Sequence, residues 1–239
     1  MGDLLFGNIA LSTYGAFFDG SKAFAKPAKD VDFISVAGRN GDLSFSNNRY
    51  SNIDIHFNCF IPTDFISNYA DIINVYSVEE GYQKLLYTTE DDIYREAQFV
   101  AATDPKTGAF NDYAQFDLVF NCKPQKFLRD YDTWISLPSS NTQIQNEGRQ
   151  DALPIFRVQG NGTLYFKDYS SVAITNLTVA GTSGYTLIDC ELQDAYWGTT
   201  NKNQYLTVSN GFPVFERNGN AISYTGFTSV EYRPRFWRL

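Results

Sequence analysis

The sequence predicts a mainly β protein, with strands and one helix in its first part and a β-sandwich in its second. Three observations support this prediction. Val, Ile, Thr, Tyr and Phe are abundant, and these residue types favour strands. Gly, Asn and Pro recur at short intervals, as they do at the turns between strands. Several short segments alternate apolar and polar side chains, which is the pattern of a strand with one buried face.

The segment around residues 31–42 organises the first part of the chain. Residues 31–36 read as a short, half-buried strand that stops at a tight turn. Glycine adopts a positive φ without steric cost and Asn tolerates it, so a turn is expected in the five residues Gly38, Arg39, Asn40, Gly41 and Asp42. Before this strand, residues 4–14 suit a strand or an arm, and residues 15–29 suit a loop.

An alternating strand and one amphipathic helix follow the turn. Apolar and polar side chains alternate in residues 53–57, and Pro62 ends this strand. Thr63 and Asp64 are good N-cap residues for the helix. Its apolar stripe recurs at helical spacing and is expected to pack on a sheet. The stripe consists of Ile66, Tyr69, Ile72, Ile73 and Tyr76.

Further strands are expected on both sides of a polar segment. In the first part they lie at 83–87, 94–100 and 116–122, with a turn at 104–108. In the second part they lie at 155–158, 163–166, 172–175, 185–190, 205–208, 214–215 and 228–232. This close spacing, with turns rich in Gly and Asn, predicts a sandwich or jelly roll.

The polar segment 136–152 is the expected linker between two domains, 1–135 and 153–239. It contains one Pro and one Gly, and the charge balance of the chain changes there. A long loop within a sandwich would have the same composition.

Acidic residues are concentrated in the first domain. Residues 1–135 hold 19 Asp and Glu against 11 Lys and Arg, whereas residues 136–239 hold eight of each. An acidic surface repels phosphates, which argues against nucleic-acid binding. It would suit a surface past which DNA slides, although simple solubility explains the charge better. No apolar run approaches the roughly 20 residues that span a bilayer, so no membrane role is expected.

The sequence contains no convincing catalytic or metal-binding pattern. The one histidine, His56, lies on the polar face of its strand, and no nucleophile-elbow sequence accompanies it. Asp189 and Glu191 are two residues apart, but a chain with 27 acidic residues yields such pairs by chance, and a solvated strand is the expected reading. The cysteines are too far apart for a disulfide framework or a zinc site, and we expect them to be buried apolar residues. They are Cys59, Cys122 and Cys190. Neither an enzyme nor a cofactor is expected.

Two aromatic segments are candidates for binding. Tyr196 and Trp197 stand beside Thr199, Thr200 and Asn201, and many β-sandwich lectins stack a sugar on an aromatic ring with amides nearby. A core or interface role for these rings is the favoured alternative. The segment 232–239 mixes aromatic residues with three arginines, a composition found in packed ring–guanidinium pairs and in interface hot spots.

In their order along the chain, the motifs resemble the distal tail protein (Dit) family of siphophages, the long-tailed, non-contractile phages, of Gram-positive hosts. The resemblance covers nearly the whole chain, and it depends on the order and spacing of motifs that are each weakly specific. These are V-A-G-R-N-G-D-L at 36–43, N-R-Y at 48–50, G-Y-Q-K-L-L-Y at 81–87, D-I-Y-R-E-A at 92–97, F-D-L-V-F-N-C-K-P at 116–124, N-G-F-P-V-F-E-R-N-G-N-A-I at 210–222 and R-P-R-F-W at 233–237.

The resemblance implies an α+β belt domain with one helix, which assembles six copies into a ring, and a galectin-like β-sandwich outside the ring. Such a hub of the virion's tail tip or baseplate is assembled in the host bacterial cytoplasm. It joins the major tail protein to the tail-associated (Tal) protein, often carries receptor-binding or upper-baseplate proteins, and lets DNA pass. The alternative is a lectin-like host-adhesion protein that uses the C-terminal sandwich at Tyr196 and Trp197.

A ring formed by an acidic domain brings like charges together at each seam between subunits. An arginine there would offset the repulsion, because its planar fork can hold a carboxylate with two hydrogen bonds. We therefore predict that the turn from Gly38 to Asp42 is an interface, in which Arg39 pairs with a carboxylate across the subunit seam. The alternative is an exposed turn arginine that contributes less than about 1 kcal/mol.

Overall fold

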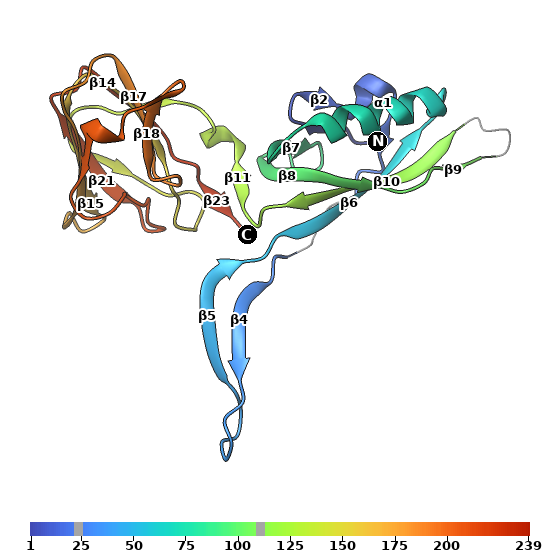
Figure 1. The fold of residues 1–239 in the computed structure, drawn as a ribbon, viewed down its shortest axis with the longest axis horizontal. Coiled ribbons are helices and arrows are strands. Elements are labelled where there is room, and N and C mark those ends of the chain that lie inside the picture. Colours follow the sequence, from blue (N-terminus) through green and yellow to red (C-terminus); the bar gives the residue numbers. More distant parts are fainter. Residues whose placement is uncertain (22–25, 109–112) are drawn as a thin grey trace. The chain divides into compact units, whose positions relative to one another are not determined.

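The computed structural model describes residues 1–21, 26–108 and 113–239, so the expected loop at 15–29 lies partly outside the described residues. The fold is mainly β with several antiparallel sheets, which confirms the predicted class. The chain divides into two compact units, Met1–Lys126 with Leu239 and Phe127–Arg238. Figure 1 shows the elements of both units.

The first unit is built on an antiparallel sheet with the strand order β2-β1-β7-β8-β10-β6-β3. Its strands are β1 (Leu4–Phe6), β2 (Ile9–Ala10), β3 (Phe17–Phe18), β6 (Ile53–Ile61), β7 (Gln83–Tyr87), β8 (Ile93–Ala102) and β10 (Ala114–Cys122). The expected strand or arm at 4–14 is instead β1, β2 and the 3-10 helix η1 (Leu11–Tyr14). The expected turn at 104–108 contains a short strand, β9 (Lys106–Thr107), which pairs with β10.

The alternation predicted for 53–57 and 116–122 places one face of β6 and β10 in the core. The two strands pair along their whole length, from Ile53 opposite Cys122 to Ile61 opposite Ala114. Their buried apolar residues are Ile55, Phe57, Cys59, Ile61, Phe116, Leu118, Phe120 and Cys122. The ring of Phe120 is central, because its centroid lies 5.1 Å from that of Phe6 and 5.8 Å from that of Phe57.

Helix α1 (Phe65–Val78) covers this face of the sheet, as predicted, and is the one α-helix among the described residues (Figure 1). Tyr76 is fully buried, and its ring lies 5.3 Å from that of Phe6. One detail of the prediction is wrong. Ile66 is 71% exposed, so it does not belong to the buried stripe. Asp64 is the N-cap residue, in agreement with the prediction, although it has a φ of 51° and its side chain makes no capping hydrogen bond. Packing therefore holds this helix in place of a side-chain cap.

The second unit is a sandwich of two antiparallel sheets. One has the order β12-β22-β14-β17-β18-β19 and the other has the order β13-β21-β15-β16-β20. The strands of the first are β12 (Ile135–Ser136), β22 (Ser229–Arg233), β14 (Ile155–Gln159), β17 (Tyr185–Asp189), β18 (Asp194–Trp197) and β19 (Thr200–Asn201). Those of the second are β13 (Thr142–Ile144), β21 (Asn220–Thr225), β15 (Gly162–Asp168), β16 (Ala173–Val179) and β20 (Leu206–Val208).

The two sheets share one apolar core. Buried side chains from facing strands meet there, including Phe156, Phe166, Leu177, Ile188 and Val230. The rings of Phe156 and Phe166 lie 5.3 Å apart in an edge-to-face arrangement that adds to the energy of their burial. Two short strands, β11 (Lys126–Leu128) and β23 (Trp237–Arg238), pair with each other. Two 3-10 helices, η3 (Arg129–Tyr131) and η4 (Asn203–Tyr205), complete the described elements.

The boundary of the second unit and one of its strands differ from those that the sequence predicts. Residues 136–152, interpreted as a linker, contain β13, which pairs with β21, and β12 pairs with β22. The second unit consequently begins at Phe127 and not at residue 153. The strand expected at 214–215 is only an isolated bridge between Phe215 and Ala152. The independent folding of the two units stays a prediction.

The three cysteines are free and buried, as predicted. Burial raises the pKa of Cys59 and Cys122 to about 12, and it also raises the pKa of Cys190. A thiol with a pKa near 12 is ~0.01% thiolate at pH 8, against roughly a quarter for an ordinary cysteine. We therefore expect iodoacetamide at pH 8 to label the native protein at least about 1,000-fold more slowly than the guanidinium-unfolded protein. Intact mass spectrometry measures both rates, and rapid labelling of the native chain would contradict the burial.

Candidate functional site

Strands β4 (Lys29–Ile34) and β5 (Leu43–Tyr50) form a ribbon that pairs with no other described strand. Figure 1 shows this β4–β5 hairpin as a separate two-stranded element. In its register, Ile34 lies opposite Leu43 and Phe33 lies opposite Ser44. The expected strand at 31–36 is thus present with shifted bounds. It belongs to a hairpin that is not part of the main sheet of its unit.

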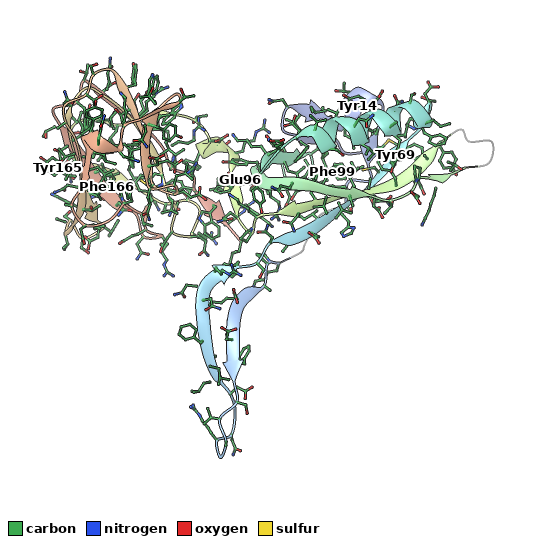
Figure 2. All side chains as sticks on the ribbon, viewed as in Figure 1. Tyr14, Tyr69, Glu96, Phe99, Tyr165 and Phe166 are labelled. Atoms are coloured by element: carbon green, nitrogen blue, oxygen red, sulfur yellow. The ribbon has the colours of Figure 1, made fainter. Side chains whose placement is uncertain are left out.

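Both faces of the β4–β5 hairpin expose large apolar side chains. Directly opposite residues share a face and neighbours along a strand alternate, so Ile34 and Phe45 lie on one face and Phe33 lies on the other. The exposed fractions are 70% for Phe33, 64% for Phe45 and 55% for Ile34. Figure 2 shows side chains projecting from both sides of the ribbon. The expectation of a half-buried strand is therefore wrong, because no element of the described chain covers either face.

Polar contacts tie the two strands together near their open end. The Nε of Arg49 donates to Oδ2 of Asp30 at 2.5 Å, and this hydrogen bond lowers the pKa of Asp30. The amide of Asn47 donates to Asp30 at 3.2 Å and to Asp32 at 3.3 Å. These contacts are exposed, so they set the register of the ribbon more than they stabilise it.

The loop of the hairpin contains the turn that the glycines predicted. Gly38 has a φ of 79° and Gly41 a φ of 81°, conformations that L-residues rarely adopt. The amide of Arg39 donates to the carbonyl of Val36 at 3.2 Å. The Arg39 side chain is exposed and makes no ion pair within the described part of the chain. Its pairing across a subunit seam, and the interface role of Asn40 and Asp42, stay predictions.

The aromatic pair nominated for sugar binding lies on β18 of the sandwich. Trp197 is 41% exposed and stacks on Tyr185, with ring centroids 5.1 Å apart and an interplanar angle of 27°. The Arg157 guanidinium lies 5.9 Å from the Tyr185 ring and 4.7 Å from the Trp134 ring. Trp197 thus ends a row of packed rings and cations, and Tyr185 covers one of its faces. A sugar platform at Tyr196 and Trp197 stays a prediction.

The carboxylate pair Asp189 and Glu191 has a structural explanation. The Nη1 and Nη2 atoms of Arg235 donate to the two oxygens of Asp189 at 3.0 and 3.2 Å, and Nη1 also donates to Glu191 at 3.1 Å. Asp189 is 2% exposed, so the expectation of a solvated strand is wrong for it. One arginine serves both carboxylates, and its ion pair with the buried Asp189 ties the C-terminal segment to β17.

The described residues hold no group of three or more His, Cys, Asp and Glu side chains placed to bind a metal ion. His56 is exposed and faces the same side of β6 as Asp54 and Asn58. Within the described ranges, no helix has the length and apolarity to cross a membrane. The most distinctive surface feature is therefore the β4–β5 hairpin.

Comparison with known proteins adds a likeness in fold. No protein-family model and no curated protein sequence matches the chain. Among solved structures, the Dit protein of phage SPP1, described as a paradigm of the hub adsorption apparatus in phages that infect Gram-positive bacteria, matches with a TM-score of 0.74 and 13% identity, over 97% of each chain. Chains of the phage P2 baseplate in its activated conformation match with TM-scores of 0.60 with Ca and 0.59 with Sr. Their identities are 12% and 10%, again over 97% of both chains. The chain thus shares the fold of SPP1 Dit over nearly its full length, which confirms the predicted resemblance at the level of the fold.

Proposed function

We propose that the protein is the structural hub of a phage tail tip or baseplate, and that it works by assembly and not by catalysis. Six copies form a ring that joins the major tail protein to the tail-associated protein, and the ring is a component of the virion. The observation that carries the proposal is the β4–β5 hairpin, which exposes Phe33 on one face and Phe45 on the other. The fold shared with SPP1 Dit supports it.

The hairpin requires protein on both sides. An isolated two-stranded ribbon is at best marginally stable in water, and exposed apolar groups of this size mark interaction surfaces. If several copies of the chain lie at one tail tip, a second copy can cover the exposed faces of the hairpin. A contact from the hairpin of one copy to a different surface of the next is heterologous, and such contacts close into a ring at a fixed number of subunits. The resemblance to the Dit family gives six.

The charge of the chain fits a ring through which DNA passes. The net charge of −8 lies in residues 1–135, the part that contains the hairpin and the main sheet. A negatively charged surface repels the phosphates of DNA, so the DNA does not adhere on its way through. Receptor-binding or upper-baseplate proteins would attach outside the ring, and the sandwich unit is the surface available to them.

The mass of the assembly tests this function. Native mass spectrometry of the full chain, alone and mixed with the neighbouring major tail protein, should show hexamers or pairs of hexameric rings. A chain that stays monomeric even with that protein present would overturn the proposal.

Arg39→Glu tests the seam contact in the same experiment. It should weaken assembly, most strongly at low salt. The melting temperature of the monomer should stay unchanged, because the Arg39 side chain is exposed and makes no ion pair within the described part of the chain. Arg149→Glu makes the same charge change at an exposed site in the second unit and should leave assembly unaffected. If Arg39→Glu assembles as well as the parent, the arginine is only a turn residue.

A further inference from the structure

A polar cleft lies at one end of the sheet β13-β21-β15-β16-β20 in the second unit. Three separate segments form it, namely β13 with the residues after it, the turn between β15 and β16, and the turn before β21. Its volume is about 880 Å³, within the range of about 300–1,000 Å³ that is common for small-molecule sites. The side chains that matter are Gln143, Gln145, Tyr169, Ser170, Arg217 and Asn218.

Contacts that do not use those six side chains fix the walls of this cleft. Gly219, with a φ of 91°, lets the turn approach β13 closely, since a Cβ there would lie 2.6 Å from the carbonyl oxygen of Ile144. The β15–β16 turn is closed by Asp168, whose Oδ1 accepts a hydrogen bond from the amide of Val172 at 2.8 Å. The buried side chain of Asn146 donates to the carbonyls of Gln150 and Phe215 at 2.8 and 3.1 Å.

The cleft therefore presents a set of uncommitted polar side chains. Within the described chain, the six named side chains make no hydrogen bond or ion pair with one another or with other residues. The amides of Gln143, Gln145 and Asn218 each offer a donor and an acceptor, and Ser170 adds a hydroxyl. Tyr169 is 68% exposed and its ring contacts no other described aromatic ring. Arg217 is the only cation, and no Asp or Glu is among the described residues that line the cleft.

We propose that this cleft binds a saccharide that carries an anionic group, such as a uronate or a phosphate substituent. The hydroxyls of a sugar pair with carboxamides, its C–H face stacks on an exposed tyrosine, and its anion pairs with an arginine that has no carboxylate partner. A peptide would need several apolar pockets for its side chains, and Ile144 is the one aliphatic residue among the described residues that line the cleft. A nucleic acid would need several cations, and the cleft has one.

This inference goes beyond the hub function and is independent of ring formation. The cleft is lined by other residues than the Tyr196 and Trp197 pair, whose sugar platform stays a separate prediction. The two aromatic sites can therefore be separated in one experiment on the full chain.

Isothermal titration calorimetry with three probes tests the proposal, namely tetragalacturonate, its neutral methyl ester, and an oligomer of glycerol phosphate. We expect an acidic probe to bind the parent protein about ten-fold more tightly than the ester, and the two acidic probes distinguish a uronate ligand from a phosphate ligand. Arg217→Gln should bring the acid and the ester to equal affinity. Tyr169→Ala should weaken the acid and the ester alike by about ten-fold, because both lose the stacked ring.

Trp197→Ala is the matched control and should leave all affinities unchanged. The melting temperature of each variant shows that it is folded, which Tyr169 and Arg217 should permit because their side chains are exposed. The proposal is overturned if the parent binds none of the probes. It is equally overturned if Trp197→Ala abolishes binding while Tyr169→Ala does not.

Discussion

Replacing both Phe33 and Phe45 with serine should abolish assembly of the proposed ring while leaving the monomer folded. The two rings lie on opposite faces of the β4–β5 hairpin and are 70% and 64% exposed, so the monomer loses almost no packing. Burying a phenylalanine at an interface contributes about 1.5–3 kcal/mol. The double variant therefore loses about 3–6 kcal/mol at each seam, a factor of ~10² to 10⁴ in the association constant. Mass photometry measures the assembled fraction, and circular dichroism measures the melting temperature.

A matched variant shows that the effect belongs to the hairpin. Ile66→Ser with Val78→Ser removes two apolar side chains of helix α1 that are 71% and 77% exposed, and it should leave assembly intact. If the helix variant fails to assemble and the hairpin variant succeeds, the interface lies on α1. Single substitutions add a further test, because a ribbon enclosed on both sides should weaken when either phenylalanine is lost.

Arg235→Ala should destabilise the second unit by about 3 kcal/mol, the lower end of the cost of breaking a buried ion pair. The substitution leaves the carboxylate of Asp189, which is 2% exposed, without its two hydrogen bonds from the guanidinium. For a unit of this size we expect the melting temperature to fall by about 10 °C or more, as scanning calorimetry would measure.

Two further variants isolate the ion pair. Arg235→Lys keeps the charge but not the planar fork, so it should recover part of the loss. Asp189→Asn combined with Arg235→Gln removes both charges and should be less destabilised than Arg235→Ala alone, because no unpaired charge remains buried. An Arg235→Ala protein that melts like the parent would show that Asp189 does not depend on this partner.

The sequence predicts the elements whose pattern is local. The alternation in 116–122 places Phe116, Leu118 and Phe120 in the core, and the helical spacing locates α1. Glycine spacing likewise identifies the positive φ at Gly38 and Gly41. These features depend on residues a few positions apart, so the chain itself carries the signal.

Features that depend on contacts between residues far apart along the chain could not be predicted from the sequence. Asp189 and Arg235 are 46 positions apart, and nothing near either residue indicates that one buries the other. The edge strand β13 is short and polar, so it resembles a linker until its pairing with β21 is known. The cleft at Tyr169 and Arg217 brings together three segments for the same reason. For the hairpin, the apolar residues of 31–36 indicate a strand but cannot show that neither of its faces is covered.

The β4–β5 hairpin also makes the unassembled chain an aggregation hazard. Each of its strands pairs on one side only, so the outer edges carry backbone N–H and C=O groups that a stray strand could bind. Exposed apolar strands with free edges are the features that favour cross-β stacking. The same strands also carry three charged residues, Asp30, Asp32 and Arg49. Charge on an edge strand discourages pairing with the wrong chain, so these residues oppose aggregation. The polar contacts near the open end of the ribbon thus protect each new copy until its hairpin is covered by a partner.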